Sequence, residues 1–229
     1  MSLMITGIER ILVEVPDLKK AKLEYKAFFG DIISHDQSSS IIVLNNSAIE
    51  LRHNPFIKKA KINGITLLDE NKSFKPKKIL PKPRGLNISS IGKRVFSNAG
   101  APNNKILSID HLVLLSNDLD DCIEEFGTHR LGIRLALDKT EPKWGGRMLF
   151  FRAGKFTLEI IQNNSSDSQR KDHFWGIAYL CSDIELTIEN LQKKDVVLSP
   201  IREGRKKGTL VATVKSHNLG LPTLLIQNK

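Results

Sequence analysis

A histidine and a glutamate each stand within a run of aliphatic residues near the middle of this chain. His111 lies in residues 109–115 (IDHLVLL), and Glu159 lies in residues 158–161 (LEII). An imidazole or a carboxylate on a buried strand face is costly without a partner, so each should be paired or line a cavity. The pair is more specific than either residue alone. Taken singly, His111 can be interpreted as a core histidine with its hydrogen bonds satisfied, and Glu159 as a charge on an edge strand.

The elements expected around these two residues form a compact unit. Residues 109–115 alternate as a strand does, and the Asn-Asp-Leu-Asp sequence at 117–120 begins a helical pattern. Three further strands are expected at 133–137, 148–151 and 156–161, the last two joined by an Ala-Gly-Lys turn. This order predicts a βαβββ unit with His111 in its first strand and Glu159 in its last.

Other stretches of the chain repeat parts of this unit. The first fifty residues contain a strand, a capped helix that ends at Gly30, and a hairpin; the last sixty begin with a strand and a capped helix. Between them, Pro76, Pro81 and Pro83 interrupt any helical pattern, so that module is expected to be shrunken. We expect an α+β fold of repeated βαβββ modules. The further strands are expected at 8–15, 40–44, 48–52, 61–68, 85–91, 93–96, 173–180, 196–201, 209–214 and 222–227.

The central unit resembles the βαβββ module of the vicinal oxygen chelate superfamily, which includes glyoxalase I, bleomycin-resistance proteins and extradiol dioxygenases. The resemblance rests on the sequences IDHL at 109–112, NDL at 117–119 and LEII at 158–161. In that superfamily two modules pair into a curved mixed sheet, and metal ligands come from the first and last strands of each. The resemblance implies that His111 and Glu159 are metal ligands, that Glu159 is catalytic, and that the cofactor is zinc, nickel, manganese or iron.

Two domains are expected, with a boundary near the sequence SNAGAPNN at 97–104. Residues 1–104 would be a degenerate, structural glyoxalase-like domain, and residues 105–229 a complete two-module domain with the candidate site. In the first domain Arg10 and Glu50 occupy the positions of His111 and Glu159. An arginine beside a glutamate predicts an ion pair rather than a metal site.

The expected metal set is incomplete. In the last module Gly176 and Leu224 occupy the two ligand positions. Two protein ligands fall short of the three or four usual for a catalytic ion. His173 and His129 are further imidazoles, but strand alternation turns His173 away from the face of Gly176 unless a bulge intervenes.

Strand alternation also predicts the lining of a small-molecule pocket. Phe174 and Leu224 would form an apolar wall, and Thr157 would stand on the polar wall with His111 and Glu159. An apolar cavity with a few convergent polar groups is the usual form of such a site. Arg147 either clamps a substrate carboxylate or is the surface arginine of a hairpin. These four residues, Thr157, Arg147, Phe174 and Leu224, are the substrate-binding candidates.

The composition limits the partners. The net charge is +10, but the excess lysines are scattered and aromatic residues are only 6%, which leaves few platforms for stacking nucleic-acid bases. The positive charge is interpreted as a solvated surface, or as a means of steering small anions to the protein. The basic turn at 202–208 either binds an acidic group or is an exposed hairpin turn. No apolar run approaches ~20 residues, and no signal peptide is recognised. We expect a cytoplasmic monomer or homodimer with reduced cysteines and no nucleic-acid or membrane partner.

Two classes of function remain open. The first is a glyoxalase-like enzyme, in which an ion at His111 and Glu159 holds vicinal oxygens of a small organic substrate for lyase, isomerase or dioxygenase-type chemistry. The second is a metal-free small-molecule-binding protein of the bleomycin-resistance type, with Arg147 and His111 as polar anchors. In both classes the partner is a small organic molecule, and steering by the positive charge favours an anionic one.

Overall fold

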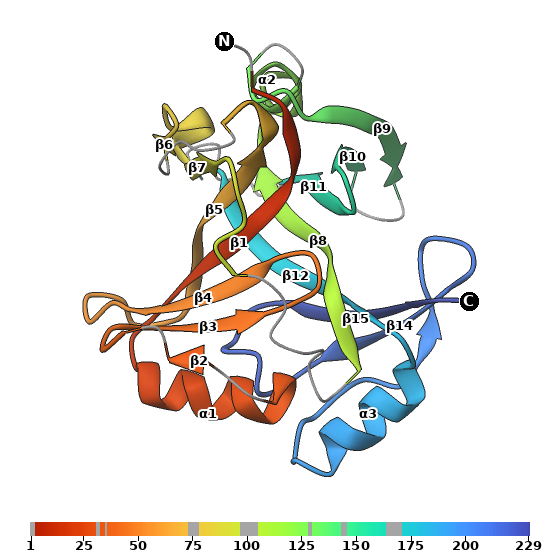
Figure 1. The fold of residues 1–229 in the computed structure, drawn as a ribbon. Helices are drawn as coiled ribbons and strands as arrows, with labels where there is room; N and C mark the ends of the chain where they lie inside the picture. Colours follow the sequence, from red (N-terminus) through yellow and green to blue (C-terminus); the bar gives the residue numbers. More distant parts are fainter. Residues whose placement is uncertain are drawn as a thin grey trace.

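Two β-sheets, built from successive halves of the chain, form the framework of the protein (Figure 1). The computed structural model describes residues 3–30, 33–34, 36–72, 78–96, 105–127, 130–142, 146–163 and 171–229. Within these ranges, sheet A has the strand order β2-β3-β4-β1-β5-β7-β6, and sheet B has the order β13-β14-β15-β12-β8-β11-β10-β9. Sheet A consists of β1 (Ile5–Val15), β2 (Ile33–Ser34), β3 (Ser39–Val43), β4 (Ala48–His53), β5 (Lys61–Asp69), β6 (Lys78–Ile79) and β7 (Asn87–Ile91). Sheet B consists of β8 (Ile106–Ser116), β9 (Arg134–Glu141), β10 (Gly146–Ala153), β11 (Phe156–Gln162), β12 (His173–Cys181), β13 (Arg202–Glu203), β14 (Thr209–Val214) and β15 (Thr223–Asn228).

The two sheets follow the same pairing plan. In sheet A, β1 pairs in parallel with β4 and antiparallel with β5, and β5 pairs in parallel with β7. In sheet B the corresponding pairs are β8 with β11, β8 with β12, and β12 with β15. The expected α+β fold of repeated modules in curved mixed sheets is thus confirmed. Between β5 and β7, the described residues form only η1 (Glu70–Lys72), β6 and η2 (Pro83–Gly85), so this module is shorter than the others.

Each helix begins at an aspartate that follows the first strand of its module. The aspartate is the N-cap, and its side chain accepts a hydrogen bond from a backbone N–H of the first turn, which would otherwise be unpaired. The helices are α1 (Leu18–Phe29), α2 (Leu119–Phe126) and α3 (Ile184–Gln192), with caps Asp17, Asp118 and Asp183. No helix in the described ranges combines the length and the apolar character needed to cross a membrane.

One hydrophobic core lies between the two sheets and includes residues of all three helices. At its centre Tyr179 of β12 packs against Phe28 and Phe29 of α1, with ring centroids 5.8 and 5.2 Å apart. The helix-bearing faces of the sheets therefore meet, and their other faces point outward. On the outward face of sheet B, Ala178, Val211, Leu224 and Ile226 form a second, small apolar cluster.

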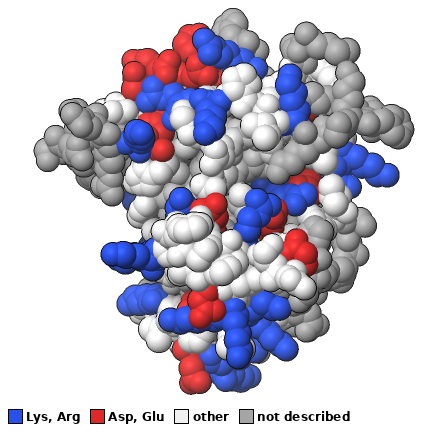
Figure 2. All heavy atoms as spheres, turned by 90° about the vertical axis from the view of Figure 1, so that its left-hand side faces the viewer, with Lys and Arg blue, Asp and Glu red and all other residues white. Residues whose placement is uncertain are grey.

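Charged side chains of both signs are intermixed on the side of the molecule that carries sheet A (Figure 2). Lysine and arginine side chains are spread over this face, with aspartate and glutamate side chains among them. On this face the positive net charge is therefore dispersed rather than gathered into one basic patch.

Two expected strands are absent from the described residues. Residues 93–96 form bends and irregular backbone, and residues 196–201 contribute only an isolated bridge between Leu198 and Val214. Pro200 lacks the N–H that a strand would use, so pairing starts only at β13, within the segment expected to be a basic turn. The boundary segment expected at 97–104 lies outside the described residues.

Candidate functional site

His111 and Glu159 lie side by side on the outward face of sheet B, as predicted. The strands β8 and β11 pair in parallel, with His111 opposite Thr157 and Glu159 opposite Val113. His111 Nε2 is 3.2 Å from Glu159 Oε2, and the two side chains are 18% and 11% exposed. We call this surface the cup face; it comprises the side chains of His111, Val113, Thr157, Glu159, Ala178 and Leu224.

A bulge in β8 brings a second carboxylate to His111. In the pairing with β12, His111 is opposite Ala178 and Ile109 is opposite Tyr179, so Asp110 is the extra residue. An extra residue of this kind re-aims its side chain. Asp110 Oδ2 lies 2.9 Å from His111 Nδ1, and the imidazole is therefore held between two carboxylates.

Positive charge gathers around Asp110. Burial raises the pKa of Asp110, but the hydrogen bond with His111 and the charges of His111, Lys206 and Arg152 outweigh burial, so the pKa is lowered below its usual value. Lys206 belongs to the basic turn between β13 and β14, and Arg152 belongs to β10. Both cations therefore act at the cup face.

The same arrangement occurs in sheet A with arginine in place of histidine. Glu9 is the extra residue of a bulge in β1, because Ile8 pairs with Leu67 and Arg10 pairs with Thr66. Arg10 Nε donates to Glu9 Oε2 at 2.6 Å, and Arg10 Nη1 donates to Glu50 Oε2 at 2.8 Å. The predicted ion pair between Arg10 and Glu50 is confirmed.

Two of the predicted substrate-binding residues share the cup face with His111. Thr157 is directly opposite His111, and its Oγ1 accepts a hydrogen bond from Arg152 Nη1 at 2.9 Å. Leu224 pairs with Ala178 and packs in the small apolar cluster of the cup face. The cup face thus has a polar side at β8 and β11, and an apolar side at β12, β14 and β15.

Phe174 was expected on the cup face, but it lies on the opposite face of sheet B. A register shift at Trp175 places Phe174 opposite Leu114 and Gly176 opposite Val113. Leu114 belongs to the main core, so Phe174 is buried there, 6% exposed, on the opposite face from Gly176. The extra residue, Trp175, is 43% exposed. The same bulge places His173 opposite Leu115, on the cup side.

Arg147 also lies away from His111. Its Nε and Nη2 donate to both oxygens of Asp138 at 2.9 and 2.7 Å, and its Nη1 donates to Asp120 of α2 at 2.7 Å. These bonds raise the pKa of Arg147 and direct its guanidinium to the helix-bearing side. Of the two alternatives for Arg147, the clamp on a ligand beside His111 is therefore not formed. The arginine of β10 on the cup face is Arg152, which is opposite Thr157.

The residues of the cup face do not fit a resident catalytic metal ion. His111 and Glu159 supply two donors, whereas three or four protein donors are usual. Among the described residues no group of three histidine, cysteine or acidic side chains is arranged to hold an ion. At Gly176 a Cβ would lie 2.7 Å from the Pro222 carbonyl oxygen, so the backbone excludes a ligand side chain there. His129 lies outside the described residues.

Comparison with known proteins agrees with this architecture. Residues 110–213 match the family model of the Glyoxalase/Bleomycin resistance protein/Dioxygenase superfamily. The match confirms the resemblance to the vicinal oxygen chelate superfamily that residues 109–161 predicted. No curated protein matches the chain.

Solved structures of low sequence identity share the fold over nearly the whole chain. A mutant of 4-hydroxymandelate synthase from Streptomyces coelicolor is 13% identical with a TM-score of 0.72, over 99% of this chain and 93% of that one. The 2,3-dioxygenase LapB from Pseudomonas sp. KL28 is 11% identical with a TM-score of 0.70, over 100% and 94%. A xylose isomerase-like TIM barrel/4-hydroxyphenylpyruvate dioxygenase fusion protein is 12% identical with a TM-score of 0.73, over 100% and 50%. These likenesses establish the fold.

Proposed function

We propose that the cup face of sheet B binds a small organic acid. The observation that carries this proposal is the position of His111, whose two ring nitrogens face the carboxylates of Asp110 and Glu159 at 2.9 and 3.2 Å. This hydrogen-bonded group combines donors and acceptors at one point of a partly apolar surface. Such a combination is typical of small-molecule sites.

The apolar side of the cup face would hold the body of the ligand. Ala178, Val211 and Ile226 are buried, and Leu224 packs against them as a cluster separate from the main core. This cluster would contact the carbon skeleton of a ligand that lies over β12 and β15. Each methylene buried there stabilises the complex by about 0.8 kcal/mol.

The charges beside Asp110 favour an acidic ligand. Lys206 and Arg152 lie close enough to lower the pKa of Asp110. Arg152 donates from Nε to the Gly154 carbonyl and from Nη1 to Thr157, and among the described residues no hydrogen bond uses Nη2, which leaves it for a ligand. An acidic group of the ligand would therefore bind Arg152 and Lys206, and a hydroxyl or carbonyl group would bind at His111 and Glu159.

Saturation-transfer NMR tests the proposal with four acids: 4-hydroxyphenylpyruvate, 4-hydroxymandelate, benzoate and pyruvate. The first two occur in the names of structurally similar proteins. We expect at least one acid to bind the wild type, and binding to be lost in His111→Ala and Arg152→Gln. Arg10→Ala removes the equivalent bridging residue of sheet A and serves as the matched control, which should still bind. Absence of binding by all four acids, or equal loss in the control, would contradict the proposal.

A second candidate function is proton transfer to and from the bound acid. It is favoured by Glu159, whose side chain is mostly buried and contacts an imidazole that is itself bound to Asp110. In this reaction Glu159 takes a proton from the carbon next to a carbonyl, the C–H electron pair moves into an enolate, and the proton later returns. Incorporation of solvent deuterium into 4-hydroxyphenylpyruvate above the uncatalysed rate, lost in Glu159→Gln, would support an isomerase or lyase. If the Glu159→Gln variant exchanged deuterium at the wild-type rate, proton transfer by Glu159 would be ruled out and only the binding function would remain.

A further inference from the structure

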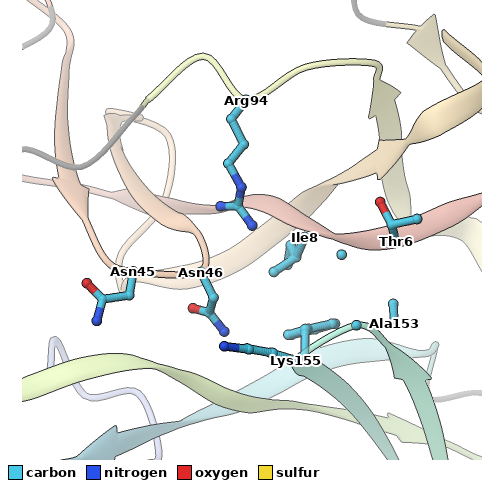
Figure 3. A pocket seen from close by; sticks show the side chains of 10 residues that line it. Thr6, Ile8, Asn45, Asn46, Arg94, Ala153 and Lys155 are labelled. Atoms are coloured by element: carbon cyan, nitrogen blue, oxygen red, sulfur yellow. The ribbon is translucent and has the colours of Figure 1, made fainter. Parts of the chain in front are cut away.

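A cavity of about 250 Å³ lies where the two halves of the molecule meet, outside the cup face (Figure 3). Its lining comes from β1, from the turn between β3 and β4, from the loop after β7 and from the turn between β10 and β11. The volume is several times the ~30 Å³ share of one water molecule, so the cavity has room for a tetrahedral oxyanion and attached waters.

Two contacts between the halves hold the walls of this cavity in place. The side chain of Asn46 donates to the Ile109 carbonyl oxygen at 2.7 Å and accepts from the Ile109 N–H at 3.0 Å. At Gly154 a Cβ would lie 2.4 Å from the Thr6 carbonyl oxygen, so the turn packs directly on the β1 backbone. The cavity is therefore formed before any ligand binds, which lowers the entropic cost of binding.

Two cations reach into the cavity from opposite halves. Figure 3 shows the side chain of Arg94 entering from the loop after β7, and that of Lys155 entering from the turn between β10 and β11. In the described part of the chain neither is hydrogen-bonded to a carboxylate; the charge of Glu9 acts on Arg94 from a distance. The Glu9 carboxylate is already hydrogen-bonded to other groups, because its oxygens accept from Arg10 Nε and from the Val95 N–H.

The surroundings of Arg94 are short of negative charge. Burial lowers the pKa of Arg94 below its usual value, and the charge of Glu9 only partly opposes this effect. A half-buried guanidinium without a bound carboxylate gains most from an anion that its planar fork can bind with two hydrogen bonds. Lys155 adds a second positive charge from the other side.

We propose that this cavity binds a small dianion, a phosphate or sulfate group, between the guanidinium of Arg94 and the ammonium of Lys155. The dianion bridges the two halves of the chain, so its binding stabilises their contact and raises the unfolding temperature. The proposal concerns a site separate from the cup face and does not depend on the function proposed for it.

Calorimetric titration with inorganic phosphate and with sulfate, at pH 8 and constant ionic strength in chloride, tests the proposal. We expect saturable binding of one dianion per chain and an increased unfolding temperature. Arg94→Gln and Lys155→Gln should each weaken binding at least about tenfold, because each loses a charge-assisted contact. Lys155 is exposed, so its substitution leaves the core intact.

Two control variants keep the test specific. Lys93→Gln removes the same charge one residue away from Arg94 and should change affinity less than about twofold, since exposed charges are screened. Lys206→Gln removes a cation of the cup face and should also leave phosphate binding unchanged. The proposal is overturned if the wild type binds neither anion, if the two cavity variants bind like the wild type, or if a control variant weakens binding as strongly as they do.

Discussion

Arg10 and His111 occupy equivalent positions in the two sheets, and each is held between two carboxylates. Each follows an acidic residue at a bulge, Glu9 or Asp110, and each reaches a glutamate on the parallel neighbouring strand. An arginine keeps its proton at any physiological pH, so the group in sheet A is a permanent ion pair. A guanidinium has no acceptor nitrogen, whereas a neutral imidazole has one donor and one acceptor nitrogen. Of the two groups, the one in sheet B is therefore the one suited to proton transfer.

Replacing His111 with alanine should lower stability modestly and leave the fold intact. The substitution removes both contacts of the imidazole and leaves the mostly buried carboxylate of Glu159 without its partner. We expect a loss of about 1–2 kcal/mol in the free energy of unfolding, from a total of roughly 5–15. Urea denaturation at pH 7 measures the loss. A loss above about 4 kcal/mol would show that His111 is chiefly structural.

The contribution of Asp110 to stability should depend on pH. Its pKa is lowered in the folded chain, so its stabilising effect is present above its usual value of 3.8 and is lost as the pH falls through the folded value. Asp110→Asn should therefore be less stable than the wild type at pH 6, and the difference should vanish under strongly acidic conditions. Denaturation series in the wild-type and His111→Ala backgrounds measure this effect. A difference of equal size in both backgrounds would contradict the role assigned to the hydrogen bond with His111.

The close packing at Gly176 predicts that even alanine is harmful there. The added Cβ would lie 2.7 Å from the Pro222 carbonyl oxygen, which is backbone and moves only with the strand. We expect Gly176→Ala to lower stability by about 1–3 kcal/mol. Gly7→Ala is the matched control, because the nearest atom to its Cβ would be Leu68 Cδ1 at 3.6 Å, an ordinary contact. Equal stability of the two variants by urea denaturation would contradict the explanation for the missing ligand.

Arg84 ties the two halves of the chain together. Its Nε donates to Asp172 Oδ2 at 2.8 Å, its Nη1 donates to Asp121, and the Asp172 side chain is only 2% exposed. Arg84→Ala leaves the Asp172 carboxylate buried without its partner, so we expect a loss of about 3 kcal/mol. The exposed Arg202 serves as control, and Arg202→Ala should cost under about 0.5 kcal/mol. Thermal and urea unfolding measure both losses. Equal stability of the Arg84→Ala and Arg202→Ala variants would contradict the role assigned to Arg84.

The positions of His111 and Glu159 could be predicted because they depend on strand periodicity and on the parallel pairing of the first and last strands of one module. Counting across the hairpin from Glu159 would also have favoured Arg152 over Arg147, since alternate residues share a face.

Other features of the molecule are set by tertiary structure. The bulge at Trp175 places Phe174 and Gly176 on opposite faces of the strand, and no residue of the local sequence signals it. The approach of Lys206 to Asp110 depends on how the turn between β13 and β14 folds over the sheet. Arg94 and Lys155 line one cavity only because the two halves pack together, so periodicity alone could not identify it.

The proposed binding of an organic acid at the cup face, through His111 and Glu159 and without a resident metal, can be measured directly. The direct measurement is a titration of ¹⁵N-labelled protein, in the presence of a chelator, with the most strongly bound of the four acids. We expect saturable amide shifts at Thr157, Glu159 and Leu224, which are absent in His111→Ala and unchanged when zinc, nickel or manganese replaces the chelator. Shifts that appear only after a metal is added, or that lie around Arg10 and Glu50, would contradict the proposed site.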